Sequence, residues 1–277
     1  MELNAETGKV KAELPKPFGT AEEIAPYGKL IFTRTAGNRW QGAEAPEVVY
    51  HDGYYYLFVA YDALNIPYNT RVLRSKNVDG PYETLDGAVT DAATGANDDP
   101  TVLTHPYKFS EGSGWVGISH CAVFDDGEGN WYYVSQQRMP DGVAGIASSN
   151  AIMMGGVRSI KWLSNGWPTV MPERYGAVPQ EAISESDIIG NWEHIDLGYR
   201  YGAQKESSDM VFGSDHTITS GNWQGATWSF DASTNTLKVG HVELKVQREV
   251  DWEASPRKTT IVYSGLYGAK SYWGKKK

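Results

Sequence analysis

The sequence predicts an all-β protein in two parts, and three observations support this prediction. Short apolar or aromatic segments alternate with turn residues, and no segment keeps a helical apolar period over several turns. The 277 residues include 17 Tyr, 10 Trp and 30 Gly, a composition that suits strands joined by tight turns. Hydrophobic residues make up 40% and charged residues 21%, so the chain is globular rather than disordered.

The first unit is a hairpin followed by a third strand. Two strands meet at His51-Asp52-Gly53, where Asp-Gly is favoured because both positions tolerate a positive φ. Residues 70–83 add a strand and a turn at Asp79-Gly80-Pro81. Residues 28–34 are expected to form one more strand, within an N-terminal segment that is otherwise rich in loops.

The second unit repeats this design about 70 residues later. Residues 119–138 form an apolar strand, an Asp/Gly turn and an aromatic strand, and residues 157–170 form a hairpin that turns at Asn165-Gly166. Repetition of such sheets at a regular period is typical of propeller blades.

After residue 186 the strands become short and closely spaced, which predicts a small antiparallel barrel. The tripeptide Gly190–Trp192 resembles the Gly-x-Trp opening of lipocalin-like barrels. We therefore place a propeller-type domain at residues 1–182 and a barrel domain at residues 183–277.

Charge and composition exclude several classes of function. The net charge of −9 argues against a nucleic-acid partner, and the sequence has no apolar run long enough to span a membrane. The first ten residues lack the apolar segment of a signal peptide. The basic run Lys275–Lys277 is expected to be a frayed, solvated end. Cys121 is the single cysteine, and its apolar strand predicts a buried, unreactive thiol.

Two carboxylates flank Pro46 at the start of the first hairpin. Exposed acidic residues are common, so residue type alone predicts that Glu44 and Glu47 are solvent-exposed residues at the start of the strand. The alternative is a general acid, which in a glycosidase needs a second carboxyl group across the scissile bond. Side chains at positions 44 and 47 of a regular strand face opposite ways, so only one of the two can point inward.

The six histidines show no close metal-ligand spacing, which argues against zinc. Residues 125–130 have calcium-loop residue types, but their short length indicates a hairpin turn. Aromatic rings can stack on sugar faces, and Trp40, Tyr61 and Trp115 are candidates for that role.

Several motifs together resemble the arabinanases of glycoside hydrolase family 43. They are AEAPEVVYHDGYYYLF, RVLRSKNVDGPYE, GWVGISHCAVFDDGEGNWYYVSQQR and VRSIKWLSNGWPTVMPERY, within residues 28–180. The region from Ser186 to Lys277 resembles the barrel appended to longer endo-arabinanases. The resemblance implies the C-terminal part of a five-bladed β-propeller followed by a lipocalin-like β-barrel.

The resemblance also implies a function, namely hydrolysis of α-1,5-L-arabinofuranosidic bonds in arabinan or arabino-oligosaccharides with inversion. Glu44 matches the general acid of the family, and His120 matches a ligand of an axial ion, expected to be calcium. The residue after this histidine is often Asn in the family and is Cys121 here.

The two catalytic aspartates of the family belong to blades that would precede residue 1. The chain alone is therefore expected to be inactive, as a fragment or with a separate chain supplying the missing blades. An exo-acting arabinofuranosidase or xylosidase, or a non-catalytic polysaccharide-binding fragment, remains open as an alternative. The substrate suggests an extracellular or periplasmic location.

Overall fold

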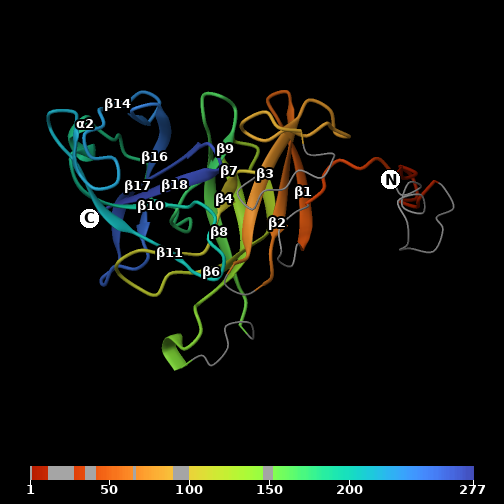
Figure 1. Ribbon diagram of the computed structural model, residues 1–277, viewed down its shortest axis with the longest axis horizontal. Helices are drawn as coiled ribbons and strands as arrows, with labels where there is room; N and C mark the ends of the chain where they lie inside the picture. The colour runs from red at the N-terminus through yellow and green to blue at the C-terminus, as the bar shows by residue number, and fades with distance from the viewer. Residues whose placement is uncertain (1, 12–27, 35–41, 65–66, 90–99, 146–151) are drawn as a thin grey trace.

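The structure of the protein is a computed structural model, described here for residues 2–11, 28–34, 42–64, 67–89, 100–145 and 152–277. Strands dominate these residues, which confirms the all-β prediction, and they form two four-stranded sheets and one eight-stranded sheet (Figure 1). The helical elements described are short, η2 (Val143–Gly145) and α2 (Glu185–Ile188). No helix in the described part of the chain has the length and apolar character needed to cross a membrane.

The first sheet is an antiparallel meander in the order β1-β2-β3-β4. Its strands are β1 (Ala43–His51), β2 (Tyr54–Tyr61), β3 (Asn69–Ser75) and β4 (Val102–Thr104). The predicted hairpin is confirmed, since Asp52 and Gly53 have φ values of 44° and 82° between β1 and β2. These two positive values are what a tight two-residue turn requires.

The second sheet repeats the meander in the order β6-β7-β8-β9. Its strands are β6 (Val116–Asp125), β7 (Trp131–Arg138), β8 (Met154–Trp162) and β9 (Pro168–Val170). The predicted turns after Asp125 and at Asn165-Gly166 are both confirmed, and Asp126 accepts hydrogen bonds from the backbone and side chain of Asn130.

The third sheet curls into a nearly closed barrel, on the side of the molecule opposite β1 in Figure 1. Its order is β13-β12-β10-β18-β17-β16-β15-β14. The amide of Trp228 donates to the carbonyl of His216 over 2.8 Å, which brings the two edges of the sheet together. Its strands are β10 (Gly190–Asp196), β12 (Ser208–Phe212), β13 (Ile218–Ser220), β14 (Trp228–Asp231), β15 (Thr236–Val239), β16 (Val242–Asp251), β17 (Lys258–Tyr267) and β18 (Lys270–Lys276).

The sheets share buried contacts rather than standing apart. One apolar cluster joins the first sheet to the second and reaches the barrel through Trp273 and Leu266, while the barrel interior has its own cluster around Trp192 and Tyr263. A short parallel ladder between β5 (Tyr107–Lys108) and β11 (Lys205–Glu206) adds a backbone connection. This packing fixes the first strands of the two meanders relative to each other.

Two expectations about the chain were wrong. Residues 28–34 form no strand, and instead Ile31 and Phe32 pack as coil against the outer face of the first sheet. The basic run is not a frayed end, because Lys275 lies in β18, between β10 and β17, and is only 2% exposed. Its ammonium group contacts three carboxylates, a partnership that sequence spacing does not show.

Candidate active site

Glu44 lies near the start of β1, where the strand carries a β-bulge. It pairs with Ala60 of β2, and the next pair of the ladder is Glu47 with Phe58, so β1 has one extra residue in this interval. Ala45 takes the positive φ of 50° that accompanies the irregularity. Bulges of this kind redirect side chains at the ends of strands.

The bulge overturns the argument that Glu44 and Glu47 must face opposite ways. Their partners Ala60 and Phe58 are two residues apart and therefore share a face of β2. Phe58 belongs to the core that faces the second sheet, and the carboxylate of Glu47 accepts a hydrogen bond from the amide of Val123 in β6 over 3.4 Å. Both acids are thus on the side of β1 that faces β6.

The carboxylate of Glu44 makes a compact cluster with a tyrosine and a histidine. The Tyr68 hydroxyl lies 2.5 Å from Oε1 of Glu44 and 3.2 Å from Nδ1 of His120, and this Nδ1 lies 3.8 Å from Oε1. The side chains of Glu44 and His120 are 49% and 57% exposed, whereas Tyr68 is fully buried. A buried hydroxyl therefore positions two accessible, chemically active groups.

Tyr68 is held as a hydrogen-bond donor. Burial raises its pKa, and the hydrogen bond to Glu44 and the charge of that carboxylate raise it further, so the pKa lies well above the ordinary tyrosine value. The phenol keeps its proton across the physiological range. Sequence reasoning missed Tyr68, because nothing local distinguishes it from the other tyrosines.

His120 reaches the cluster through a matching bulge in β6. Ser119 pairs with Gln136 and Ala122 with Val134, so β6 also has one extra residue in this interval, where His120 has a φ of 52°. The first strand of each meander therefore carries a bulge with a non-glycine residue at positive φ. One bulge redirects the carboxylate of Glu44 and the other redirects the imidazole of His120.

Buried hydroxyl groups lock the two meanders together beneath the cluster. The Thr70 hydroxyl lies 2.8 Å from the hydroxyls of both Ser119 and Tyr133, and Ser119 also donates to the carbonyl of Asn69 over 3.0 Å. These bonds join β3 to β6 directly below the residues that carry Glu44 and His120. Glu44 and His120 are therefore carried by strands, while Tyr68 lies directly before β3.

Glu44 also borders a cavity of about 260 Å³ on the other side of β1. Its remaining lining residues are apolar: Ile31, Phe32, Ala43, Pro46, Leu57 and Val59. This cavity lies on the face of β1 away from Tyr68 and His120, so the carboxylate of Glu44 points away from it. Val48 and Tyr50 continue this surface along β1 as exposed apolar side chains.

The described residues place few protein oxygens at His120 for a hard cation. Its Nδ1 is engaged by Tyr68, and no hydrogen bond to its Nε2 comes from the described residues. Calcium prefers oxygen ligands, so this donor set fits an ion that keeps a mostly aqueous shell. The sequence did not predict a cluster of three carboxyl groups, which consists of Glu173, Asp251 and Glu253. The ammonium group of Lys275 already occupies the centre of this cluster.

The structure also decides the roles of several other candidates. Cys121 is buried, and burial followed by the charge of Glu47 raises its pKa to about 12, which confirms an unreactive thiol. Tyr61 and Trp115 are buried in apolar clusters and offer no face to a sugar. Trp40 lies outside the described residues.

Comparison with known proteins agrees with this architecture. A family model described as glycosyl hydrolases family 43 matches residues 19–168, more than half of the chain, and one described as a C-terminal lipocalin-like domain matches residues 172–274. The extracellular endo-alpha-(1->5)-L-arabinanase 2 of Bacillus subtilis (strain 168) is 27% identical over 90% of this chain and 55% of its own length. The extracellular endo-alpha-(1->5)-L-arabinanase of Thermotoga petrophila is 26% identical with the same two coverages.

A solved structure matches nearly the whole chain. The family 43 glycoside hydrolase YxiA of Bacillus licheniformis superposes with a TM-score of 0.77 and 25% identity over 99% of this chain and 61% of its own. These findings place the chain in the class of the glycoside hydrolases. The chain belongs to glycoside hydrolase family 43. It spans about half the length of the curated arabinanases that it matches.

Proposed function

We propose that this chain contributes the general-acid half of an arabinan-hydrolysing site, with Glu44 as the proton donor. The observation that carries this proposal is the half-exposed carboxylate of Glu44, held by Tyr68 beside His120, in a member of a glycoside hydrolase family. The substrate would be α-1,5-linked L-arabinofuranose chains, by analogy with the names of the relatives. Their names also support an extracellular location.

Inversion requires a second carboxyl group that activates water on the opposite side of the sugar. We propose that this base, and the aspartate that tunes the acid, come from sequence outside this chain, in a longer protein or a partner chain. The exposed apolar strip of Val48 and Tyr50 beside the cavity at Glu44 supports an additional sheet packing on this face, so that the two meanders would be blades of a larger propeller. Residues 1–182 would then form the propeller part and residues 183–277 the barrel.

A general acid must hold a proton when the scissile bond breaks, and burial or a nearby like charge favours the protonated form of a carboxyl group. Bound sugar would exclude water from the half-exposed side chain of Glu44, and the complementing part would supply a nearby carboxylate. Part of the acid's activation would therefore come from outside these residues.

The test compares Glu44→Gln with Glu47→Gln in the arabinan-hydrolysing protein that contains this chain. Loss of a general acid lowers the rate by roughly 10²–10⁴-fold on linear arabinan. An aryl arabinofuranoside with a good leaving group needs little proton donation, so its hydrolysis should be far less affected. Glu47→Gln should change both rates little, because its carboxylate serves one long hydrogen bond. Equal losses on both substrates, or full activity of Glu44→Gln on arabinan, would reject the acid role.

Two further measurements address the rest of the proposal. NMR of the first products should show the inverted anomer, and the oligosaccharide pattern should show internal cleavage; release of single sugars from chain ends would favour an exo-acting enzyme. The isolated 277-residue chain should hydrolyse arabinan negligibly, and activity equal to that of the longer protein would refute the need for a complementing base.

A further inference from the structure

A groove runs along the seam between the β8–β9 turn and the outer surface of the barrel. It consists of two cavities, of about 350 Å³ and 360 Å³, which share Ser164 and Glu243. Each lies within the roughly 300–1,000 Å³ typical of ligand sites. Figure 1 places β14, at one end of the groove, on the opposite side of the molecule from β1, the strand that carries Glu44. The groove is therefore separate from the candidate active site.

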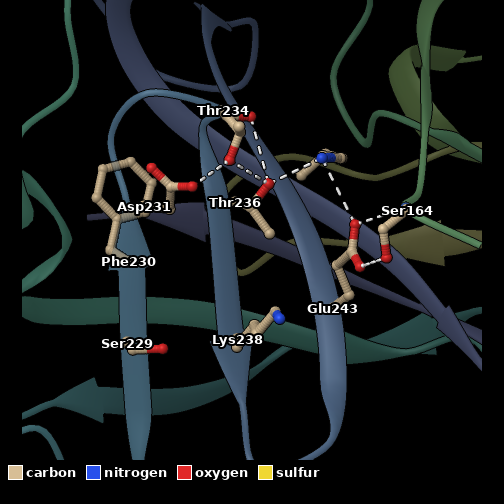
Figure 2. Close-up of a pocket in the computed structure, with 9 residues that line it drawn as sticks. Ser164, Ser229, Phe230, Asp231, Thr234, Thr236, Lys238 and Glu243 are labelled. Carbon is tan, nitrogen blue, oxygen red and sulfur yellow. Dashed lines mark hydrogen bonds and ion pairs between the residues drawn. The ribbon is translucent and has the colours of Figure 1, made fainter.

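The first cavity is floored by a regular array of polar side chains. Ser229 pairs with Lys238 and Lys238 with Glu243, while Asp231 pairs with Thr236 and Thr236 with Lys245. The two rows are two residues apart, so all six side chains share the outer face of β14, β15 and β16. Figure 2 shows Ser229, Asp231, Thr236, Lys238 and Glu243 around the hollow, with Phe230 at its side.

Internal hydrogen bonds fix this array in place. Lys245 donates to the Thr236 hydroxyl over 2.8 Å, and the Thr234 hydroxyl bonds to both Thr236 and Asp231 over 2.9 Å (Figure 2). Glu243 accepts hydrogen bonds from the amide and hydroxyl of Ser164, which ties the barrel to the β8–β9 turn. The polar groups are therefore ordered before any ligand arrives.

The charges of the array balance. Hydrogen bonds from Ser233 and Thr234 lower the pKa of Asp231. Burial raises the pKa of Glu243, but the hydrogen bonds from Ser164 and the charge of Lys245 outweigh it and lower the pKa overall. Two ionised carboxylates thus face the ammonium groups of Lys238 and Lys245. Such a surface suits a neutral ligand rich in hydroxyl groups better than an ion.

The second cavity adds aromatic surface. The rings of His241 and Tyr267 lie 4.3 Å apart at their centroids, and Tyr267 is 49% exposed at the cavity. Leu266 and Leu85 extend the apolar lining. Flat rings beside polar groups are the combination that a sugar needs, since its C–H faces pack on rings and its hydroxyls take the hydrogen bonds.

We propose that this seam groove is an ancillary binding site for a neutral polysaccharide, with sugar stacked at Tyr267 and the chain continuing over Lys238. The choice of arabinan as its ligand rests on the proposed function, whereas the site itself does not. Such a site would hold the polymer while the distant active site cuts it.

The test measures binding of the 277-residue chain carrying Glu44→Gln, so that hydrolysis cannot remove the ligand. Affinity electrophoresis through linear arabinan, with xylan and a β-glucan as parallel gels, gives a dissociation constant for each polymer. Tyr267→Ala should weaken binding roughly three- to tenfold through loss of a ring contact, and Lys238→Ala roughly fivefold through loss of a hydrogen bond. Tyr201→Ala, which removes an equally exposed (49%) tyrosine outside the groove, should leave binding unchanged.

Each outcome decides the proposal. Loss of binding in the two groove variants alone, with unchanged thermal unfolding, supports it. The same losses on xylan or β-glucan but no binding of arabinan would support the site and contradict the arabinan assignment. No binding of any polymer, or equal binding by Lys238→Ala, Tyr267→Ala and Tyr201→Ala, would overturn it. A folding defect in Tyr267→Ala leaves the surface variant Lys238→Ala as the deciding measurement.

Discussion

Replacement of Lys275 by methionine should severely destabilise the protein at neutral pH. The ammonium group lies 2.9 Å from Asp251, 2.9 Å from Glu253 and 3.0 Å from Glu173. The contacts to Asp251 and Glu253 are hydrogen bonds, whereas the one to Glu173 is electrostatic. All four side chains are at most 8% exposed, so water cannot replace the lost cation.

The magnitude follows from leaving buried acids unpaired. Burial and the neighbouring Glu253 raise the pKa of Glu173 well above its usual value, and the charge of Lys275 opposes this shift. Burial alone would lower the pKa of Lys275, but the charges of Glu173 and Glu253 raise it overall. Lys275 thus supplies the positive charge that three buried carboxyl groups share. Removal of one partner from such a buried group costs about 3–5 kcal/mol of unfolding free energy.

The assay is urea denaturation followed by tryptophan fluorescence at pH 7 and pH 5. The cost of Lys275→Met should shrink at pH 5, because acids without their cation take up protons more readily in the folded state. Adding Glu253→Gln should restore part of the stability at pH 7. Lys277→Met is the matched control: its pair with Asp209 is exposed, so it should cost about 0–1 kcal/mol. If Lys275→Met costs no more than this control, the account of the group is wrong.

Three further predictions concern pH, metal and backbone. Burial lowers the pKa of His105 and of His194 from 6.5 to about 4, so the unfolded chain binds protons first as pH falls. The free energy of unfolding should therefore decline as the pH falls from 6.5 towards 4. The decline is at most about 3 kcal/mol for each histidine, because the pKa differs by about 2.5 between the two states and each pKa unit corresponds to about 1.36 kcal/mol. His194→Gln should reduce this pH dependence of the free energy of unfolding, measured by urea denaturation. Calcium should raise the melting temperature of the parent protein but not of His120→Ala, measured by calorimetry against a chelator-treated sample; equal shifts would exclude His120 as a ligand. Ala45→Val should strongly lower arabinan hydrolysis, measured with the complementing part present, because a β-branched residue resists the positive φ that the bulge requires and the Glu44 position is lost; unchanged hydrolysis would contradict the role of the bulge.

Local patterns predicted most of the strand architecture. Asp52-Gly53 and Asn165-Gly166 specify turns through backbone conformation alone, so both hairpins could be placed before their partners were known. The strand predicted for residues 28–34 does not form, because an apolar segment can pack on a sheet without pairing with its edge. Whether a segment pairs depends on a free sheet edge, which a local pattern does not reveal.

Tertiary contacts account for what the sequence could not predict. Lys275 was predicted from the sequence to be a solvated terminal residue, because its carboxylate partners come from distant segments. Tyr68 lacked any local mark, since its role depends on Glu44 and His120 arriving from two different sheets. The seam groove depends in the same way on a turn of the second sheet meeting the barrel at Ser164 and Glu243.

The expected effect of Ala45→Val follows from the alternation of side chains along a strand. In a regular β1, Glu44 and Glu47 would face opposite sides, and the extra residue at the bulge brings both onto the face towards β6. Valine resists the φ of 50° that Ala45 takes, so it favours the regular strand, which turns the Glu44 carboxylate away from Tyr68 and His120 without removing any core side chain. Ala45→Gly is the informative partner variant: glycine accepts the φ of 50° without strain, so it should keep activity and unfold no more easily than the parent. Loss of activity in Ala45→Val together with retention in Ala45→Gly would show that the position of the carboxylate, rather than the alanine side chain, is what the bulge preserves.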